Sequence, residues 1–221
     1  MHCPIPFARP LSRLLLATAL VGLSGCASLL DRQPTTPPAS AEQLSAWQMH
    51  REQVEALNDW AFDARAAVRS GLTGGSGHLE WTQVGPVSSL TMSGPFDSGR
   101  VALTGTASRM LITDARGNSR ISTDPEQLLE ELTGWRVPLA RLPRWVRGLP
   151  DTPLDELTTD RFRLDAQGRL VRLSERDWTV EYERYRAAGN APALPHFIEM
   201  RNDEVRIRLV IDDWQIEADG E

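Results

Sequence analysis

Short segments in which apolar and polar residues alternate, separated by turn-forming residues, restrict the fold of this sequence more than any other feature. The first, residues 60–68 (WAFDARAAV), places Trp60, Phe62 and Val68 on one face, as a half-buried strand requires. Further strands are expected at residues 78–84, 87–93, 99–105, 109–114, 119–122, 161–164, 169–174, 178–182, 196–201 and 205–211. Many short strands joined by Gly, Pro, Asn and Asp predict an antiparallel meander that curls toward a barrel.

Helical patterns precede this β-rich region and interrupt it. A helix is expected over residues 41–57, because Ser40 and Gln43 have the spacing of a capping box. Its apolar face would be formed by Leu44, Trp47, Val54 and Leu57. A second helix is expected to begin near Asp124 and to end at Gly134, and a third, shorter one is expected within residues 139–148.

The glycine-rich run at residues 71–77 is interpreted as a flexible hairpin loop between the first two strands. A phosphate-binding loop is the alternative, but its Gly-Lys-Ser/Thr ending is missing and no helical pattern follows. Two pairs of adjacent carboxylates, Asp212-Asp213 and Glu130-Glu131, are interpreted as solvent-facing charges, because neighbours in a strand or helix point in different directions.

The N-terminal residues predict export and lipid attachment. Arg9 and Arg13 flank the start of an apolar run at residues 14–23, which is too short to cross a membrane that requires about 20 residues. The run leads into Leu-Ser-Gly-Cys, ending at Cys26, which resembles the bacterial lipobox, in which the cysteine thiol is acylated before cleavage. An ordinary signal peptide that ends near a cysteine is the alternative.

Cleavage before Cys26 would divide the chain into a signal (residues 1–25), a lipidated cysteine with a Pro-rich tether (residues 26–40) and a single domain (residues 41–221). That domain contains no cysteine, which excludes a disulfide and a thiol nucleophile. Because two of the 24 basic residues lie in the signal, the mature chain would carry 22 against 30 acidic residues, a net charge of −8 that argues against nucleic-acid binding. Every basic residue is arginine, so Schiff-base chemistry on lysine is excluded.

No group of residues predicts catalysis, a cofactor or a metal site. His50, His78 and His196 are far apart in the sequence and have no metal-ligand spacing, and the HExxH and GxSxG motifs are missing. His78, beside glycines, is a weak candidate for a base, and a solvated strand histidine is the better interpretation. The arginines that recur every three residues over 141–147 are interpreted as a solvated helix face, with docking of an acidic carrier as the alternative.

Two stretches of the mature chain are distinctive: residues 133–150, TGWRVPLARLPRWVRGLP, and residues 206–216, RIRLVIDDWQI. The first is similar to the most recognisable segment of the LolB family, the outer-membrane lipoprotein receptors of Gram-negative bacteria, and the second to that family's last strand. The lipobox and the loop at residues 93–99, SGPFDSG, stand where the family has its anchor and its protruding loop. The resemblance extends over the whole mature chain.

This resemblance implies an unclosed antiparallel β-barrel, mainly β with some α, in which helices plug an apolar cavity. Such a receptor accepts lipoproteins from the periplasmic carrier LolA, binds their acyl chains and inserts them into the outer membrane, without catalysis or cofactor. We expect a monomer that is lipid-anchored in the outer membrane and faces the periplasm. The outer membrane is expected because Ala27 follows Cys26, where an aspartate would signal inner-membrane retention. Two other functions stay open: a lipid-anchored binding protein of similar fold and, less favoured, an anchored hydrolase.

The proposed cargo requires an apolar container. An exposed acyl chain of about 16 carbons would cost on the order of 12 kcal/mol in water. Aromatic and leucine side chains of the predicted strands and plug are candidates for the lining, and ordinary core packing is the alternative for each one. The candidates are Trp60, Phe62, Trp81, Leu103, Leu128, Leu132, Trp135, Leu139, Leu142, Trp145, Trp178 and Trp214.

The loop tip formed by Gly94, Pro95 and Phe96 is the candidate membrane-insertion loop. A turn tip normally carries polar residues because it faces water, which makes Phe96 unusual. The family usually has leucine there, and phenylalanine is apolar as well. We expect Phe96 to enter the outer membrane; folding back onto the sheet is the alternative.

Overall fold

The computed structural model describes residues 38–94, 99–187 and 189–216. The expected acylation site at Cys26 and the loop residues Pro95 and Phe96 lie outside these ranges, as do the signal and most of the tether. Among the described residues, no helix is both long and apolar enough to cross a membrane.

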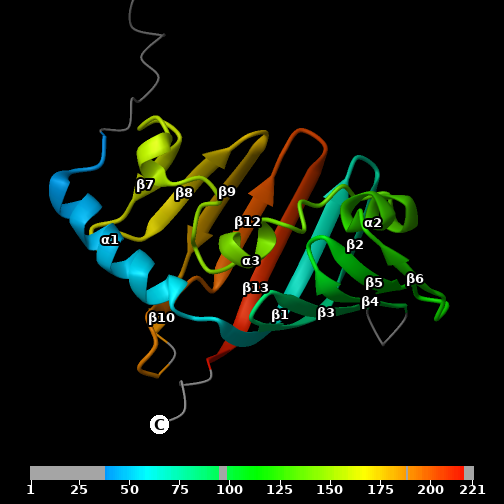
Figure 1. Cartoon of the computed structure of the whole chain (residues 1–221). Coiled ribbons are helices and arrows are strands. Elements are labelled where there is room, and N and C mark those ends of the chain that lie inside the picture. The colour runs from blue at the N-terminus through cyan, green and yellow to red at the C-terminus, as the bar shows by residue number, and fades with distance from the viewer. Residues whose placement is uncertain (1–37, 95–98, 188, 217–221) are drawn as a thin grey trace, which may run out of the picture. The chain divides into compact units, whose positions relative to one another are not determined.

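The described strands build one antiparallel sheet of eleven strands and a small two-stranded ribbon (Figure 1). The strands of the sheet are β1 (Asp59–Ser70), β2 (Thr73–Val84), β3 (Val87–Ser93), β4 (Arg100–Thr106), β5 (Arg109–Thr113), β6 (Ser119–Ser122), β7 (Phe162–Leu164), β8 (Leu170–Glu175), β9 (Trp178–Glu183), β12 (Phe197–Arg201) and β13 (Val205–Ile216). Their spatial order is β6-β5-β4-β3-β2-β1-β13-β12-β9-β8-β7. Because the edge strands β6 and β7 do not pair with each other, the sheet stays open, which confirms the predicted unclosed antiparallel barrel.

Each of the expected strands is present in the sheet. The pattern did not reveal the ribbon of β10 (Arg186–Ala187) and β11 (Ala193–Leu194), or the 3-10 helix η2 (Leu154–Glu156), which are too short to show a period. The pattern also placed the end of the last strand at residue 211, which is too early. A β-bulge beside Asp63 lets both Asp212 and Asp213 face solvent, so that Trp214 is buried and β13 continues to Ile216.

The glycine-rich run is strand rather than loop. Only Gly71 and Leu72 form the β1–β2 turn, and β2 begins at Thr73. A Cβ at Gly77 would overlap the carbonyl oxygen of Ser93, and a Cβ at Gly75 would lie 3.2 Å from the Trp135 ring. The prediction of a flexible loop is therefore wrong, because these glycines let the neighbouring strand and an indole approach β2 closely.

Helix α1 (Ala41–Glu55) begins at the predicted capping box, in which Ser40 and Gln43 bond each other's backbone N–H. The Gln43 side chain also donates to the carbonyl of Leu164, which ties the helix to β7 (3.1 Å). The prediction for Leu44 is wrong, since its side chain is 38% exposed. The buried face instead consists of Trp47, His50 and Val54.

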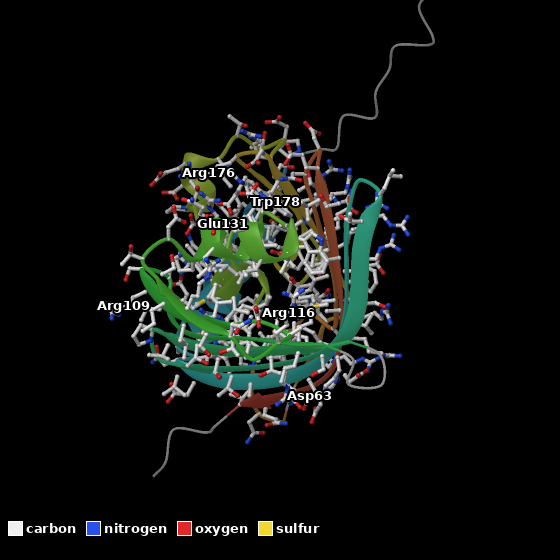
Figure 2. The ribbon with its side chains drawn as sticks, turned by 90° about the vertical axis from the view of Figure 1, so that its right-hand side faces the viewer. Asp63, Arg109, Arg116, Glu131, Arg176 and Trp178 are labelled. Atoms are coloured by element: carbon white, nitrogen blue, oxygen red, sulfur yellow. The ribbon has the colours of Figure 1, made fainter. Side chains whose placement is uncertain are left out.

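Helix α2 (Pro125–Thr133) and the short helix α3 (Leu142–Trp145) lie between β6 and β7 in the sequence, as predicted. Asp124 caps the start of α2 by accepting from the Gln127 N–H (3.1 Å), and Gly134 ends it in the left-handed conformation (φ +75°). Figure 2 shows the sheet curving around these green helical segments, which occupy its concave side. The inward residues of the strands, which alternate with exposed ones, form the core there with the helical segments.

Candidate binding cavity

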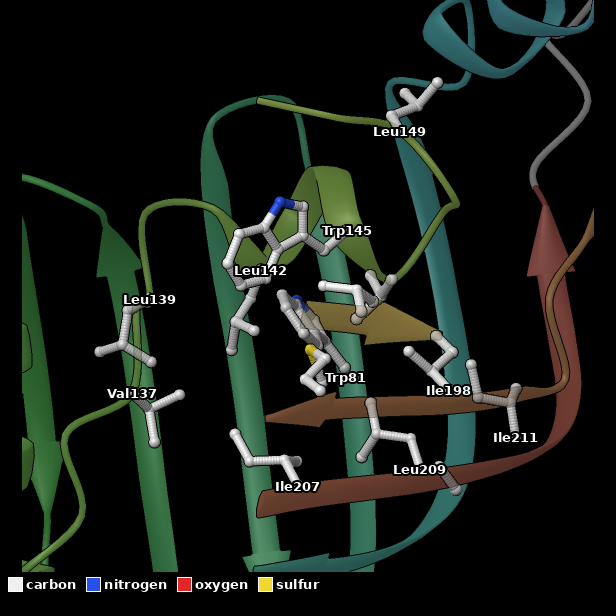
Figure 3. Packing of buried hydrophobic residues seen from close by; sticks show 14 of the residues in the cluster. Trp81, Val137, Leu139, Leu142, Trp145, Leu149, Ile198, Ile207, Leu209 and Ile211 are labelled. Carbon is white, nitrogen blue, oxygen red and sulfur yellow. The ribbon is translucent and has the colours of Figure 1, made fainter. Parts of the chain in front are cut away.

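An apolar cavity of about 120 Å³ lies between the concave face of the sheet and the chain segment from Leu129 to Leu142, here called the cover. The sheet contributes Ala66, Val68, Leu79, Trp81, Leu90, Met92, Val101, Leu103, Met200, Ile207 and Leu209. The cover contributes Leu129, Thr133, Trp135, Val137, Leu139 and Leu142. Figure 3 shows Leu139 and Leu142 on the same side of the sheet as Trp81, Ile207 and Leu209.

The lining offers almost no polar group to a ligand. The hydroxyl of Thr133 donates to the carbonyl of Leu129 (2.7 Å), so it is occupied within α2. The Nε1–H of Trp135 is buried and has no hydrogen-bond partner among the described residues. An apolar cavity of this size stays dry, because a water molecule needs two or more polar partners. The cavity surface is wholly apolar and therefore suits hydrocarbon; the Trp135 Nε1–H does not face it.

Residues 134–140 of the cover are attached to the sheet through apolar contacts. Their hydrogen bonds within the described part of the chain go to α2 or to the cover itself. Arg136 donates to Glu130 (2.8 Å) and the Ala140 N–H to Glu126 (3.3 Å). This half of the cover can leave the sheet without breaking a hydrogen bond to it.

The following segment, residues 142–152, is held by a buried carboxylate. Glu175 on β8 is 3% exposed and accepts from Trp145 Nε1 (2.7 Å) and from the backbone N–H groups of Asp151 (3.0 Å) and Thr152 (2.5 Å). Such charge-assisted bonds are roughly twice as strong as neutral ones. Sequence reasoning missed Glu175, because locally it is only another acid beside a turn.

Two arginines of the predicted series join α3 to the end of α1. Arg147 donates to the carbonyl of Val54 (3.1 Å), and Arg144 forms an ion pair with Glu55 (2.9 Å). Burial lowers the pKa of Arg147 to about 10, which leaves it charged at neutral pH. The solvated face predicted for this series is therefore wrong, because both guanidinium groups are part-buried: Arg147 satisfies carbonyls at the end of α1, and Arg144 bonds to Glu55 and to the carbonyl of Pro150.

The predicted cavity residues fall into three groups. Those that line the cavity are Trp81, Leu103, Trp135, Leu139 and Leu142. Those in an aromatic cluster with Trp81, beyond the cavity, are Trp60, Phe62 and Trp214. Those packed elsewhere are Trp145 against Trp178, with ring centroids 6.0 Å apart, and Leu128 and Leu132 of α2. Sequence reasoning missed the small and aliphatic lining residues, although the same alternation places Ala66 and Val68 inward.

His50 and His78 lie in different environments. His50 is buried in α1, where desolvation and the Arg169 charge lower its pKa. The exposed Nε2 of His78 lies 3.4 Å from Asp63 and 3.8 Å from Glu80 on the convex face. This cluster was not foreseen, because strand pairing brings Asp63 and Glu80 together across β1 and β2.

The predicted insertion loop leaves the sheet between β3 and β4. Its base is closed by a hydrogen bond from the Gly94 N–H to the carbonyl of Gly99 (3.1 Å). Gly99 has a φ of +80°, which favours glycine. The loop therefore starts from a fixed base, and its tip residues Pro95 and Phe96 lie outside the described ranges.

Comparison with known proteins identifies the family. The sequence profile described as "Outer membrane lipoprotein LolB" matches residues 58–214. Proteins named outer-membrane lipoprotein LolB are 36% identical in Pseudomonas aeruginosa (91% of this chain and 94% of the relative) and 34% identical in Xanthomonas campestris (91% and 95%). A further relative of that name, from Stutzerimonas stutzeri, is 34% identical over 93% of this chain and 96% of its own length. The chain that builds this covered apolar cavity therefore belongs to the LolB family of outer-membrane lipoproteins.

Proposed function

We propose that this chain accepts lipoproteins from the periplasmic carrier LolA, seats their acyl chains in the apolar cavity and inserts them into the outer membrane. The coarser part of this function follows from the family: the chain is an outer-membrane lipoprotein receptor of the Lol pathway and not an enzyme. The handover from LolA, the use of the cavity and the periplasmic orientation are the proposal. The observation that carries it is an apolar cavity covered by residues 134–140, which have no hydrogen bond to the sheet among the described residues.

Acyl-chain binding requires the cover to move. The cavity of about 120 Å³ is smaller than the roughly 300–1,000 Å³ of pockets that enclose drug-sized ligands. Residues 134–140 have no hydrogen bond to the sheet to lose, whereas residues 142–152 are held through Glu175. We infer that residues 134–140 lift from the sheet while residues 142–152 stay in place as a hinge.

Trp135 has a specific part in this proposal. Its indole lines the cavity, and its buried Nε1–H lacks a partner in the closed form. An unmet buried donor costs about 1–3 kcal/mol. This donor does not face the cavity in the structure, so cargo would reach it only after residues 134–140 lift. The ester carbonyl of an acylated lipoprotein would then accept from the Nε1–H, which would favour the lifted arrangement.

The lipid anchor at Cys26 and the insertion loop at Phe96 are also proposals, and they account for membrane attachment and for release of the cargo. Acylation of Cys26 would keep the protein at the outer membrane, where the LolB relatives are named as residents. Insertion of Phe96 would contribute at most about 2–3 kcal/mol, which suits a transient contact during release. Phe96→Glu should then accept cargo from LolA but fail to deliver it to liposomes, while Phe96→Leu should act nearly as wild type. Delivery by Phe96→Glu at the wild-type rate would remove the loop from the proposal.

Photo-crosslinking tests the use of the cavity. A photoreactive amino acid at Leu103 or Leu139 should capture the palmitate-labelled acyl chains of a lipoprotein handed over by LolA. The same group at the exposed Arg116 should capture none and serves as the control (Figure 2). Capture at Arg116 and not at the two lining positions would mean that the interior is simply a packed core. An anchored hydrolase would give no capture at any of them.

A further inference from the structure

Three arginines surround an open hollow on the convex face of the sheet, beside the tip of the β1–β2 hairpin. Arg69 on β1 and Arg206 on β13 are direct cross-strand partners, and Arg208 is the next outward-facing residue of β13. The hollow has a volume of about 700 Å³. Its floor is formed by the small residues Ala67, Gly74 and Ser76.

The charges around the hollow are not balanced. Like charges directly opposite each other destabilise a sheet, as the Arg69–Arg206 pair must. Glu199 bonds to Arg208 (2.5 Å) and lies 3.5 Å from Arg206 and 4.0 Å from Arg201, so one carboxylate serves three guanidinium groups. Arg69 forms no ion pair with another described residue. The hollow is therefore positively charged, although the whole chain has a net charge of −6. Binding of an anion there would reduce the repulsion between the arginines.

An apolar side chain stands at the rim of this positive hollow. Leu72 occupies the tip of the hairpin and is fully exposed (107%). Turn tips normally carry polar residues, and leucine gains nothing by facing water. Guanidinium groups bind phosphate oxygens in a bidentate manner. Arginines beside an exposed leucine thus match a ligand with phosphate next to hydrocarbon.

We propose that this arginine hollow binds the phosphate headgroup of an anionic phospholipid while Leu72 enters the acyl region of the same leaflet. The docked hairpin would hold the folded domain in one orientation on the membrane. The hollow is on the convex face and the apolar cavity on the concave one, so headgroup binding is separate from acyl-chain binding. Either proposal, headgroup binding or acyl-chain binding, can therefore be refuted by experiment without refuting the other.

The test uses the lipid-anchored protein reconstituted into vesicles. Thr73→Cys next to Leu72 carries a polarity-sensitive dye, since the folded domain has no other cysteine. We expect nitroxide-labelled lipids to quench this dye in vesicles that contain phosphatidylglycerol and not in pure phosphatidylcholine. A dye at Thr82→Cys, exposed toward the other end of β2, should stay unquenched in both and serves as the positional control.

Charge variants then identify the site. Each arginine near an anionic surface contributes about fivefold, so Arg69→Gln with Arg206→Gln should lower the ratio of docked to free hairpin about thirtyfold. The control pair Arg109→Gln with Arg163→Gln removes the same charge from exposed positions outside the hollow and should leave that ratio within about twofold. Leu72→Ser should also reduce quenching.

Three outcomes would overturn this proposal. The first is a dye at position 73 that remains open to aqueous quenchers in both kinds of vesicle. The second is equal loss of quenching in the two arginine pairs, which would indicate general charge attraction. The third is loss of quenching on adding inorganic phosphate at constant ionic strength, which would make the hollow a site for soluble phosphate. Thermal unfolding of each variant checks that the fold is intact.

Discussion

Replacing Ala66 by leucine would fill the cavity from the sheet side without changing a polar group. Ala66 is 5% exposed on β1, points inward and lines the cavity. Its neighbour two residues earlier, Ala64, is fully buried on the same face but does not line the cavity. The two alanines thus allow the same substitution to be made with and without free space beside it.

The expected change in stability follows from the volume. At about 24 cal/mol per Å³, filling all of the cavity of about 120 Å³ would contribute at most about 3 kcal/mol. Imperfect fit opposes this, because overpacking commonly costs 1–3 kcal/mol. We therefore expect Ala66→Leu to raise the free energy of unfolding by about 1 kcal/mol, and Ala64→Leu to lower it by about 1–3 kcal/mol.

Stability and function should change in opposite directions in Ala66→Leu. A closed form stabilised by 1 kcal/mol is about fivefold harder to open, and the added side chain also occupies acyl-chain space. Urea unfolding measures the first effect, and transfer of a labelled lipoprotein from LolA measures the second. We expect half-saturation of transfer to require at least fivefold more cargo. Wild-type transfer by a stabilised Ala66→Leu protein would refute the assignment of this cavity to acyl chains.

Three further predictions concern single groups. Glu175→Ala should lower the free energy of unfolding by about 3–5 kcal/mol, because it removes the acceptor of the buried Trp145 Nε1–H and of the part-buried N–H groups of Asp151 and Thr152; a urea midpoint close to wild type would contradict this. Because the pKa of His50 is lowered in the folded state, its contribution to stability is fully present above the unfolded pKa of about 6.5 and is lost as pH falls through the folded pKa. His50→Phe should therefore flatten the fall in the free energy of unfolding between pH 7 and 5. Parallel stability curves for the variant and the wild type would exclude this role of His50. Cys26→Ala should abolish palmitate labelling, and continued labelling of that variant would sink the anchor proposal.

Much of the secondary structure was predictable because its signals are local. Alternation with a period of two marked the strands, and Asp124 and Gly134 marked the ends of α2 through hydrogen bonds and dihedral angles that involve only nearby residues. The open barrel and the apolar covering segment were expected from resemblance to the LolB family, and the open sheet is confirmed. The roles of Cys26 and Phe96 stay predictions.

The remaining features depend on partners distant in the sequence. Residues 73–77 look like a loop because they are rich in glycine, yet they form a strand that Ser93 and Trp135 approach closely. Glu175 looks like a surface acid, yet it holds residues 145–152 from 23 or more positions away. A local pattern reports which side of a strand is apolar. It does not report which distant donor, ring or charge will contact that side, because those contacts form only when the sheet curves. The cavity and the arginine hollow were therefore decided by the tertiary structure.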